Sequence, residues 1–423
     1  MRYRRPRGVN DLFPPEIACW QAAEALFRDL CRRWRYQEIR TPLFEQTELF
    51  LRAVGEDTDL ASKEMYTFED RGGRSLTLRP EGTAPVVRAY LENALQGQDR
   101  ERLVKLYYVA PIFRYDRPQA GRYRQHHQCG AEALGSANPA VDAEIIALAL
   151  SFYRGLGISQ VALLLNSVGC PACRPAYVRR LQEAVEPHLA ELCADCQHRF
   201  AANPLRLLDC KQARCREIAS ASPALVESLC SDCGEHFTGV QAALQAMAIG
   251  FTLEPRIVRG LDYYTSTAFE FVAPGLGAQD SLGGGGRYDG LVEQCGGPPT
   301  PAVGVGIGLE RALLAQQAAG AAAPEPPRQG VFVVALGEEA WLPALSLLQT
   351  LRQAGQAAEV DYRRRSLRAQ LRFADAEGYQ WAAILGEEEL AAGGVTLRDL
   401  VSGEQQPVPL AELPARLSQE AEG

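Results

Sequence analysis

A proline- and alanine-rich segment, Gln316–Gln329, divides the chain into two parts with different patterns and so limits its possible folds. The segment runs from small residues to prolines, which is typical of a linker that is stiff at its proline end. At 423 residues the chain is also longer than one hydrophobic core normally supports. We therefore expect two or three domains, with one boundary in this segment, written 316–329.

Beyond the linker, residues 330–423 alternate between short apolar runs and helical patterns. Strands alternating with helices in so short a stretch predict a small α/β domain with a largely parallel core sheet. The expected strands are Val331–Leu336, Glu359–Asp361 and Trp381–Leu385, and the expected helices lie at Trp341–Leu351 and Ser366–Glu377.

Before the linker, residues 1–165 and 251–320 are predicted to form one α+β domain with a mainly antiparallel sheet. Its expected elements are a helix at Trp20–Arg32 and strands at Leu103–Val109, Ala268–Val272 and Ala302–Ile307. Residues 166–250 change character to helices, short turns and cysteines, which indicates a helical insertion.

Composition excludes some classes of protein. The chain is 47% hydrophobic and 23% charged, as is ordinary for globular proteins, and it has no apolar run long enough to span a bilayer. The basic N-terminus lacks the apolar stretch of a signal peptide, so we expect no membrane association and a cytoplasmic location. A net charge of −8 argues against binding nucleic acid by bulk attraction but allows local basic patches.

The segment Arg256–Tyr264 places a cation, a glycine, a carboxylate and two phenols together after a strand-like run. Arg259 offers a planar fork of donors suited to phosphate or carboxylate oxygens. Tyr263 and Tyr264 offer flat faces with a hydroxyl at the rim, which suits a small aromatic or heterocyclic ligand. The alternative is a strand end with two core tyrosines and a surface ion pair.

A second segment, Phe113–Gln125, predicts a hairpin that turns near Pro118 and Gly121 and carries four arginines. So many like charges would repel one another unless anions lie among them. The alternative is a solvated edge hairpin, although such edges usually mix charges of both signs.

Two further segments indicate close approach of the backbone to a ligand. Glu81, Gly82 and Thr83 combine a carboxylate, a glycine and a hydroxyl in one turn. The glycine run Gly283–Gly286 and the alternating glycines before Arg311 suit a flat ligand such as a purine, and Arg311 at the start of the next helix would reach its phosphates.

Together these segments resemble the histidyl-tRNA synthetase family of class II aminoacyl-tRNA synthetases over nearly the whole chain. Phe113-Arg114 and its hairpin are similar to motif 2 of that class, and Gly304–Arg311 is similar to motif 3. Thr41–Glu45 is similar to the end of motif 1, the dimer-forming element. Arg259–Tyr264 and Gly285–Gly290 are similar to the histidine-specific signatures. Ser266 and His126 depart from the family pattern, since a longer side chain and an aromatic ring are common there.

The resemblance implies ATP-dependent ligation of L-histidine to tRNA(His) through a histidyl-adenylate, with release of AMP and pyrophosphate, by a homodimer. Arg259 and Arg114 would be catalytic at the α-phosphate and the histidine carboxylate. ATP would be held by Arg114, Arg122 and Arg311, and Mg²⁺ would bridge its outer phosphates.

The resemblance also implies two sets of binding residues. Histidine would contact Glu81, Gly82, Thr83, Arg114, Gln128, Glu132, Arg259, Tyr263, Tyr264 and Tyr288. The ammonium group would lie at Glu132 and Gln128, and the imidazole at Glu81, Tyr264 and Tyr288. For tRNA, Arg117 and Gln119 would meet the acceptor end, and Arg368 and Gln370 are expected on the exposed face of a basic helix in an anticodon-binding domain.

Eight cysteines fall within 64 residues of the insertion. Paired C-x-x-C spacings are typical of structural zinc sites, and reduced buried thiols are the alternative. Zinc is not implied by the family resemblance, because many members lack such pairs. The candidate ligands are Cys170, Cys173, Cys193, Cys196, Cys210, Cys215, Cys230 and Cys233.

Two other functions share parts of this pattern. The regulatory subunit of ATP phosphoribosyltransferase keeps a synthetase-like core without an anticodon domain. A class II synthetase for proline, threonine or glycine would share both domains, but the segment Arg259–Tyr264 argues against it.

Overall fold

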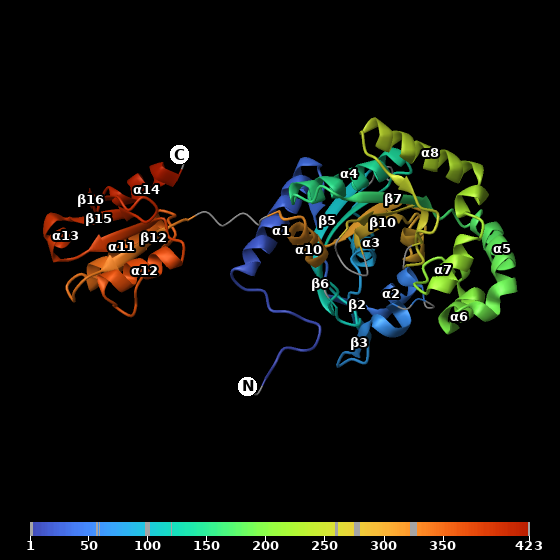
Figure 1. The fold of residues 1–423 in the computed structure, drawn as a ribbon, viewed down its shortest axis with the longest axis horizontal. Helices are drawn as coiled ribbons and strands as arrows, with labels where there is room; N and C mark the ends of the chain where they lie inside the picture. Colours follow the sequence, from blue (N-terminus) through green and yellow to red (C-terminus); the bar gives the residue numbers. More distant parts are fainter. Residues whose placement is uncertain are drawn as a thin grey trace. The chain divides into compact units, whose positions relative to one another are not determined.

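The computed structural model describes residues 3–55, 58, 60–97, 102–119, 121–258, 261–274, 280–321 and 328–421. The chain divides into two compact units, Met1–Ala323 and Pro324–Gly423, which are described separately (Figure 1). The boundary lies within Gln316–Gln329, although the last helix of the first unit, α10 (Leu309–Ala318), includes the first three of those residues.

The first unit is built on an eight-stranded sheet in the order β1-β5-β6-β11-β10-β9-β7-β8. The six strands from β5 to β7 pair antiparallel, whereas β1 and β8 pair parallel at the two edges. The predicted α+β domain with a mainly antiparallel sheet is therefore confirmed. In the order of the sheet, the strands are Gln37–Glu38, Val104–Phe113, Gln125–Leu134, Ala302–Gly308, Ser281–Arg287, Thr265–Val272, Ala162–Ser167 and Thr252–Leu253.

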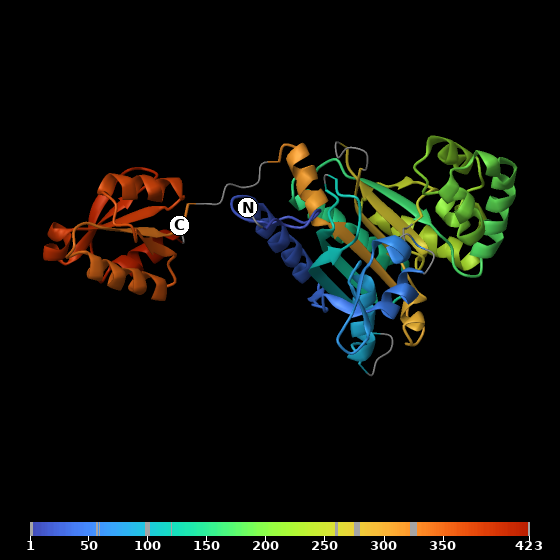
Figure 2. The same ribbon diagram turned by 90° about the horizontal axis from the view of Figure 1, so that it is seen from below.

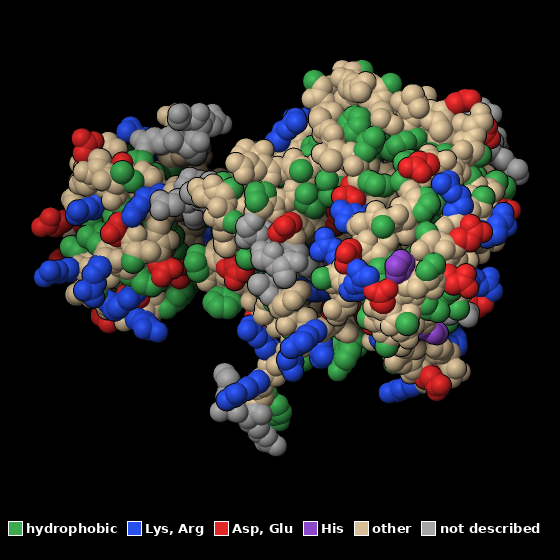
Figure 3. Space-filling model, turned by 45° about the vertical axis from the view of Figure 1, so that its right-hand side comes forward, with side chains coloured by type: hydrophobic (Ala, Val, Ile, Leu, Met, Phe, Trp, Pro, Cys, Tyr) green, Lys and Arg blue, Asp and Glu red, His purple; other side chains and the backbone are tan. Residues whose placement is uncertain are grey.

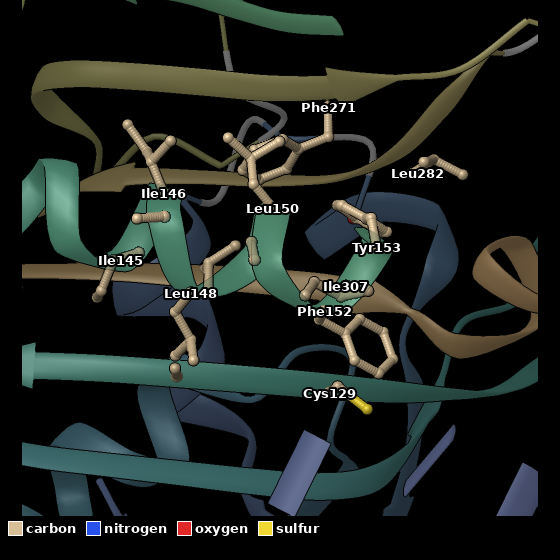
Figure 4. Packing of buried hydrophobic residues seen from close by; sticks show 14 of the residues in the cluster. Cys129, Ile145, Ile146, Leu148, Leu150, Phe152, Tyr153, Phe271, Leu282 and Ile307 are labelled. Atoms are coloured by element: carbon tan, nitrogen blue, oxygen red, sulfur yellow. The ribbon is translucent and has the colours of Figure 1, made fainter. Parts of the chain in front are cut away.

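One face of this sheet carries the main hydrophobic core. Odd-numbered positions of β6 and β11, such as Cys129 and Ile307, point to this face because side chains alternate along a strand. Figure 4 shows Phe152 of helix α4 lying near Cys129 and Ile307, and Leu150 lying near Phe271 of β9. The helices on this side are α1 (Glu16–Arg33), α4 (Pro139–Gly155), α8 (Ser231–Ala246) and α10.

The opposite face receives the even-numbered positions, and these include most of the candidate site. It is bordered by α2 (Thr47–Val54), α3 (Thr83–Glu92) and α9 (Leu291–Gln294). A small antiparallel sheet, β2-β4-β3, adjoins them, with a short π-helical turn between β2 and β3 in the chain. The strands of this sheet are Phe44–Gln46, Ser75–Leu78 and Tyr66–Glu69, and the turn is Leu60–Glu64.

The insertion forms a body of its own between β7 and β9, which are neighbours in the sheet. Its helices (green) lie together at the end of the unit near β7 in both views (Figures 1 and 2). They enclose a separate core around Leu181 and Leu207. Helix α8 differs, because Phe237 and Val240 belong to the main core. The insertion helices are α5 (Arg174–Val185), α6 (Ala194–Ala202) and α7 (Ala213–Ser220), with 3-10 turns at Glu186–Glu191, Pro204–Leu207 and Leu225–Ser228.

The second unit is a five-stranded sheet in the order β13-β12-β14-β15-β16. The three strands with the predicted positions pair parallel, and an antiparallel pair, β15 and β16, extends the sheet. The strands are Ala358–Val360, Val331–Ala335, Trp381–Leu385, Gly394–Asp399 and Gln405–Pro409 in sheet order. The helices are α11 (Trp341–Gln353), α12 (Leu367–Ala376), α13 (Glu387–Ala392) and α14 (Leu413–Ala421).

Arg256–Tyr264 follows a strand, as expected, but that strand, β8, is only two residues long. Strand β8 stops at Leu253, and the described residues that follow form a turn and an irregular loop leading into β9. The cause lies at Pro255, which has no N–H for a ladder and places the chain in a turn. Among the described helices, none is both long and apolar enough to cross a membrane.

Candidate active site

The floor of the candidate site is a buried polar cluster centred on Glu132 of β6. Its carboxylate accepts hydrogen bonds from the Tyr288 hydroxyl at 2.6 Å and from the Thr83 hydroxyl at 2.8 Å. Glu81 lies beside it and accepts backbone N–H groups of Thr83 and Ala84, each at 2.7 Å, at the N-terminus of α3. A carboxylate is favoured at that position because the first N–H groups of a helix lack intrahelical partners.

The alternating glycines of β11 make room for this cluster. A Cβ atom on Gly304 would lie 1.7 Å from a carboxylate oxygen of Glu132, and one on Gly306 would lie 1.7 Å from the amide nitrogen of Gln128. Each glycine is the registered partner, or the near neighbour, of the side chain it accommodates. The side-chain amide oxygen of Gln128 is buried and has no partner among the described residues. The glycines thus create space over the sheet for polar side chains.

Both carboxylates on this floor titrate abnormally. Burial raises the pKa of Glu132 to about 8, although hydrogen bonds from Tyr288 and Thr83 oppose the shift. Burial likewise raises the pKa of Glu81, against the two backbone N–H groups. Perturbed carboxylates in a cavity are typical of sites that bind a cationic ligand group, because an incoming cation would offset the cost of burying the charge.

Four tyrosines surround the floor. Tyr263 and Tyr288 are buried, with ring centroids 5.7 Å apart, and the Tyr263 hydroxyl lies 3.5 Å from Glu81. Tyr264 is half-buried and stacks against Tyr263 at 4.6 Å. Tyr108 of β5 was missed by the sequence analysis. Its ring fills the space that side chains on Gly82 and Gly130 would occupy, so the glycines alone hinted at a large neighbour.

Three of the predicted arginines line the cavities of the candidate site. Arg114 and Arg122 line two adjoining cavities of about 690 and 550 Å³, and Arg311 lines the second. Arg114 donates to the carbonyl of Pro80 at 2.7 Å, Arg122 pairs with Asp116, and Arg311 donates to the carbonyl of Ser281. The hairpin is therefore not a solvated edge, since β5 and β6 are inner strands of the sheet.

Arg259 and Gly260 lie outside the described residues. The residues that flank them are described: Val258 lines the second cavity and Leu261 the first. Part of the alternative interpretation of this segment also holds, because Arg256 pairs with Glu254 at 2.9 Å and Tyr263 is a buried residue of the core.

The two adjacent histidines have separate environments. The backbone N–H of His127 donates to Glu310 at 2.9 Å, and its ring Nδ1 lies 3.1 Å from the same carboxylate. His126 lines the second cavity, and burial, followed by the nearby Arg114, lowers the pKa of His126 to about 3. The imidazole of His126 is therefore neutral and offers an uncharged aromatic ring to the cavity.

The expected tRNA contacts lie in both units. Arg117 and Gln119 are exposed in the hairpin loop. In the second unit Arg368 is exposed, and Figure 3 shows basic side chains gathered along one side of this unit. The expectation that Gln370 is exposed is wrong: it is buried and donates to the carbonyls of Ala335 and Arg365. Helical periodicity explains the error, because positions 368 and 370 lie on different sides of α12.

The eight insertion cysteines form two groups of four. Within each group the sulfur atoms all lie within 4.8 Å of one another. Four of the Sγ–Sγ separations are 3.7, 3.8, 3.9 and 3.9 Å. Cluster A consists of Cys170, Cys173, Cys230 and Cys233, and cluster B of Cys193, Cys196, Cys210 and Cys215.

An antiparallel sheet with arginines from a hairpin and from the helix after a glycine strand, joined to a separate α/β unit, defines a class II aminoacyl-tRNA synthetase. Comparison with known proteins specifies the family. The family model for histidyl-tRNA synthetase matches residues 8–312, and that for the anticodon binding domain matches residues 330–420. The chain therefore belongs to the histidyl-tRNA synthetase family, and the sequence-based prediction of that family is confirmed.

Individual relatives agree over the full length. A histidine–tRNA ligase of Desulforudis audaxviator is 55% identical over 425 residues and covers 100% of both chains. One of Pelotomaculum thermopropionicum is 53% identical over 406 residues, or 96% of this chain and 95% of the relative. The apo crystal structure of S. aureus histidyl-tRNA synthetase matches with a TM-score of 0.83 and 37% identity, covering 98% of this chain and 99% of that one. The family's reaction is ATP-dependent histidine–tRNA ligation, for which Mg²⁺ accompanies ATP.

Proposed function

We propose that this chain ligates L-histidine to tRNA(His) through a histidyl-adenylate, releasing AMP and pyrophosphate, and that the cluster around Glu132 binds the amino acid. The observation that carries the proposal is the position of this cluster: a buried pair of carboxylates lies close to Arg114, which donates to the carbonyl of Pro80, the residue before Glu81. A zwitterionic amino acid needs an anionic subsite for its ammonium group and a cationic one for its carboxylate.

Glu132 and Gln128 would hold the ammonium group. Glu132 supplies the charge, and the buried amide oxygen of Gln128, which lacks a partner among the described residues, supplies a further acceptor. Thr83 orients the Glu132 carboxylate through its hydroxyl. An ammonium placed here would also draw the pKa of Glu132 back towards its ordinary value, because it favours the charged carboxylate.

The imidazole would lie between Glu81, Tyr264 and Tyr288, with Tyr263 behind them. A pocket built to pair both ring nitrogens rejects amino acids that leave its buried polar groups unpaired. Gly82 lets the Tyr108 ring reach the floor of the pocket. These contacts would select histidine over amino acids of similar size.

ATP would occupy the arginine-lined cavities. Arg114 would hold the α-phosphate and the histidine carboxylate, with Arg259 on the other side, while Arg122 and Arg311 would meet the outer phosphates. Attack of the carboxylate on the α-phosphorus builds negative charge that these guanidinium groups stabilise. The second cavity also contains the carboxylates of Glu270 and Asp280, which fit the oxygen-ligand preference of Mg²⁺.

Transfer RNA would be met by Arg117 and Gln119 at its acceptor end and by Arg368 in the second unit. Gln370 would act indirectly: its hydrogen bonds to Ala335 and Arg365 position the strand-to-helix junction that precedes Arg368. Phosphate contacts of this kind fix register, whereas contacts to base edges specify sequence.

Both cysteine clusters would bind structural Zn²⁺. Four thiolates arranged tetrahedrally at about 2.3 Å from zinc are separated from one another by about 3.8 Å. Three Sγ–Sγ separations in cluster A, 3.7 to 3.9 Å, and one in cluster B, 3.9 Å, match that value and are far longer than a disulfide bond. Two Zn²⁺ per chain are therefore expected. Both would stabilise the fold and would take no part in the reaction.

The active form would be a homodimer acting in the cytoplasm. Residues at and near motif 1 expose apolar side chains on the small sheet: Leu43 is 47% exposed, Phe44 49% and Phe68 43%. Phe44 and Phe68 contact each other edge to face at 6.1 Å and form a continuous apolar patch. A second copy of the chain would cover this patch, because exposed apolar patches of this kind mark interfaces.

The decisive experiment is amino-acid-dependent exchange of pyrophosphate into ATP, carried out with each of the twenty amino acids. Histidine alone is expected to support exchange. Exchange with proline, threonine or glycine instead would contradict the proposal, and no exchange with any amino acid would favour a regulatory protein. Charging of tRNA(His) with labelled histidine completes the assignment.

A further inference from the structure

Cluster A adjoins the start of strand β9, directly after the tyrosines of the candidate histidine pocket. The turn that leads into Cys170 is hydrogen-bonded to this strand on both sides of Ser266. The N–H of Val168 donates to the Ser266 carbonyl at 2.7 Å, and the N–H of Ser266 donates to the Gly169 carbonyl at 3.0 Å. Any displacement of the cysteine turn would therefore move this end of β9.

Arg174 makes a second connection between cluster A and the pocket. It is the first residue of α5 and follows Cys173. Its guanidinium donates to the carbonyl of Tyr264 at 2.6 Å and to the carbonyls of Val168 and Gly169 at 3.3 Å. One half-buried side chain thus joins the cysteine turn to the backbone of a pocket tyrosine.

Ser266 makes the third contact between cluster A and the pocket. It is only 8% exposed, its backbone has a left-handed φ of 49°, and its Oγ lies 4.0 Å from the sulfur of Cys233. A non-glycine residue with this φ is strained, and such strain persists only where surrounding contacts hold it.

The two cysteine pairs of cluster A come from different parts of the first unit. Cys230 and Cys233 lie at the start of α8, which packs in the main core, whereas Cys170 and Cys173 begin the insertion. Cluster B differs, because its four cysteines all lie within the insertion, around α6 and α7. A metal in cluster A would therefore clamp the base of the insertion against the catalytic unit, while one in cluster B would stabilise the insertion itself.

We propose that Zn²⁺ bound by cluster A, acting through Arg174 and Ser266, positions Tyr264 and so sets the affinity for histidine. This inference rests on the proposed function, because it assumes that Tyr264 contacts histidine. Contacts just outside a metal site typically change affinity or activity by about 10- to 100-fold when they are removed. We expect an effect of that size on histidine and not on ATP.

The test compares matched single variants of the full-length, tag-free protein. Cys230→Ser removes a cluster A ligand, and Cys215→Ser removes a cluster B ligand that does not line either cavity. Each is expected to lower zinc content, measured by mass spectrometry, from two to one per chain. Cys230→Ser should raise the histidine KM in pyrophosphate exchange by about 10-fold or more, with the ATP KM unchanged within about twofold. Cys215→Ser should leave both values near wild type.

Two further variants separate metal binding from its effect on the pocket. Cys230→His keeps a zinc ligand and should restore both the second zinc and the histidine KM. Arg174→Met should keep two zinc ions yet weaken histidine binding, measured by calorimetry without ATP, because it removes the three hydrogen bonds to the turn and to Tyr264.

Several results would overturn the proposal. Wild-type protein free of zinc would do so, as would a Cys230→Ser protein that loses zinc but keeps its histidine KM. Equal increases in the histidine KM of Cys230→Ser and Cys215→Ser would show only general destabilisation. Failure of the proposed function is distinguishable, since wild-type protein would then show no histidine-dependent exchange at all.

Discussion

The hydroxyl of Tyr288 donates a 2.6 Å hydrogen bond to the carboxylate of Glu132, although 156 positions separate the two residues. Glu132 lies on β6 and Tyr288 directly follows β10, so the bond reaches across the intervening strand β11. The hydrogen bond crosses β11 at Gly304, which is the registered partner of Glu132. A glycine in one strand thus allows a tyrosine from the next to fix the central carboxylate of the pocket.

Gly304→Ala is expected to abolish histidine-dependent exchange, because the new methyl group would lie 1.7 Å from a Glu132 oxygen. Gly308→Ala on the same strand is the matched control, since its methyl group would lie 3.8 Å from Arg311, an ordinary contact. Pyrophosphate exchange and circular dichroism would be measured for both variants. A Gly304→Ala variant that exchanges pyrophosphate at the wild-type rate would contradict the proposed placement of the pocket.

Glu132→Gln is expected to raise the histidine KM about 100-fold or more, because a buried charge partner for the ammonium group is lost. The substitution is nearly isosteric. Tyr288 and Thr83 donate to different oxygens of Glu132, so the amide oxygen keeps one of these hydrogen bonds and an NH₂ group replaces the other acceptor. Calorimetry with histidine alone would measure the effect. Unchanged affinity would show that the ammonium group binds elsewhere.

The same variant should alter the pH dependence of stability without ligand. The pKa of Glu132 is about 8 in the folded protein against 4.5 ordinarily. Between these values the unfolded chain ionises while the folded one stays protonated, so the free energy of unfolding falls as pH rises, by up to about 1.4 kcal/mol per pH unit. Glu132→Gln should flatten this slope between pH 5 and 8 in urea unfolding. An unchanged slope would assign it to other groups, such as Glu81.

Arg259→His is expected to reduce adenylate formation by about 1000-fold, because the fixed cation that we propose at the α-phosphate would be replaced by a largely neutral ring. The fold should survive, which circular dichroism would check. Single-turnover formation of histidyl-adenylate is the direct measurement. Retained activity would assign the stabilising charge to Arg114 alone.

Arg368→Ala is expected to raise the KM for tRNA several-fold and to weaken its salt dependence, while leaving pyrophosphate exchange unchanged, because exchange needs no tRNA. Arg364→Ala is the control, since Arg364 already pairs with Glu338 at 2.7 Å. Aminoacylation at two salt concentrations would separate them. Equal effects of both variants would indicate a diffuse charge contribution.

Phe44→Glu combined with Phe68→Glu is expected to yield monomers, because each charge would have to be buried at the proposed dimer interface. Light scattering coupled to gel filtration would measure the mass. Both side chains are exposed in the single chain, so its fold should not change. A dimer that persists in the double variant would place the interface elsewhere.

The sequence predicted the fold class because local signals agreed with the tertiary structure. The helix expected at Trp20–Arg32 is the centre of α1, and the strand expected at Trp381–Leu385 is β14 itself. A turn at Pro255 separates the short strand β8 from the segment that begins at Arg256. The prediction for Gln370 was wrong, because the face that a short helix buries depends on what packs against it.

The motif residues, their chemical types and the family were determined by the sequence alone, since these depend on identity and spacing. Only the tertiary structure decided which of them share a cavity. Tyr108 entered the site, and the cysteines separated into two groups of four, because sheet register and packing bring together residues far apart in the chain. No local pattern encodes such distances. These distances depend on which face of each strand is buried in the core and which face lines the site.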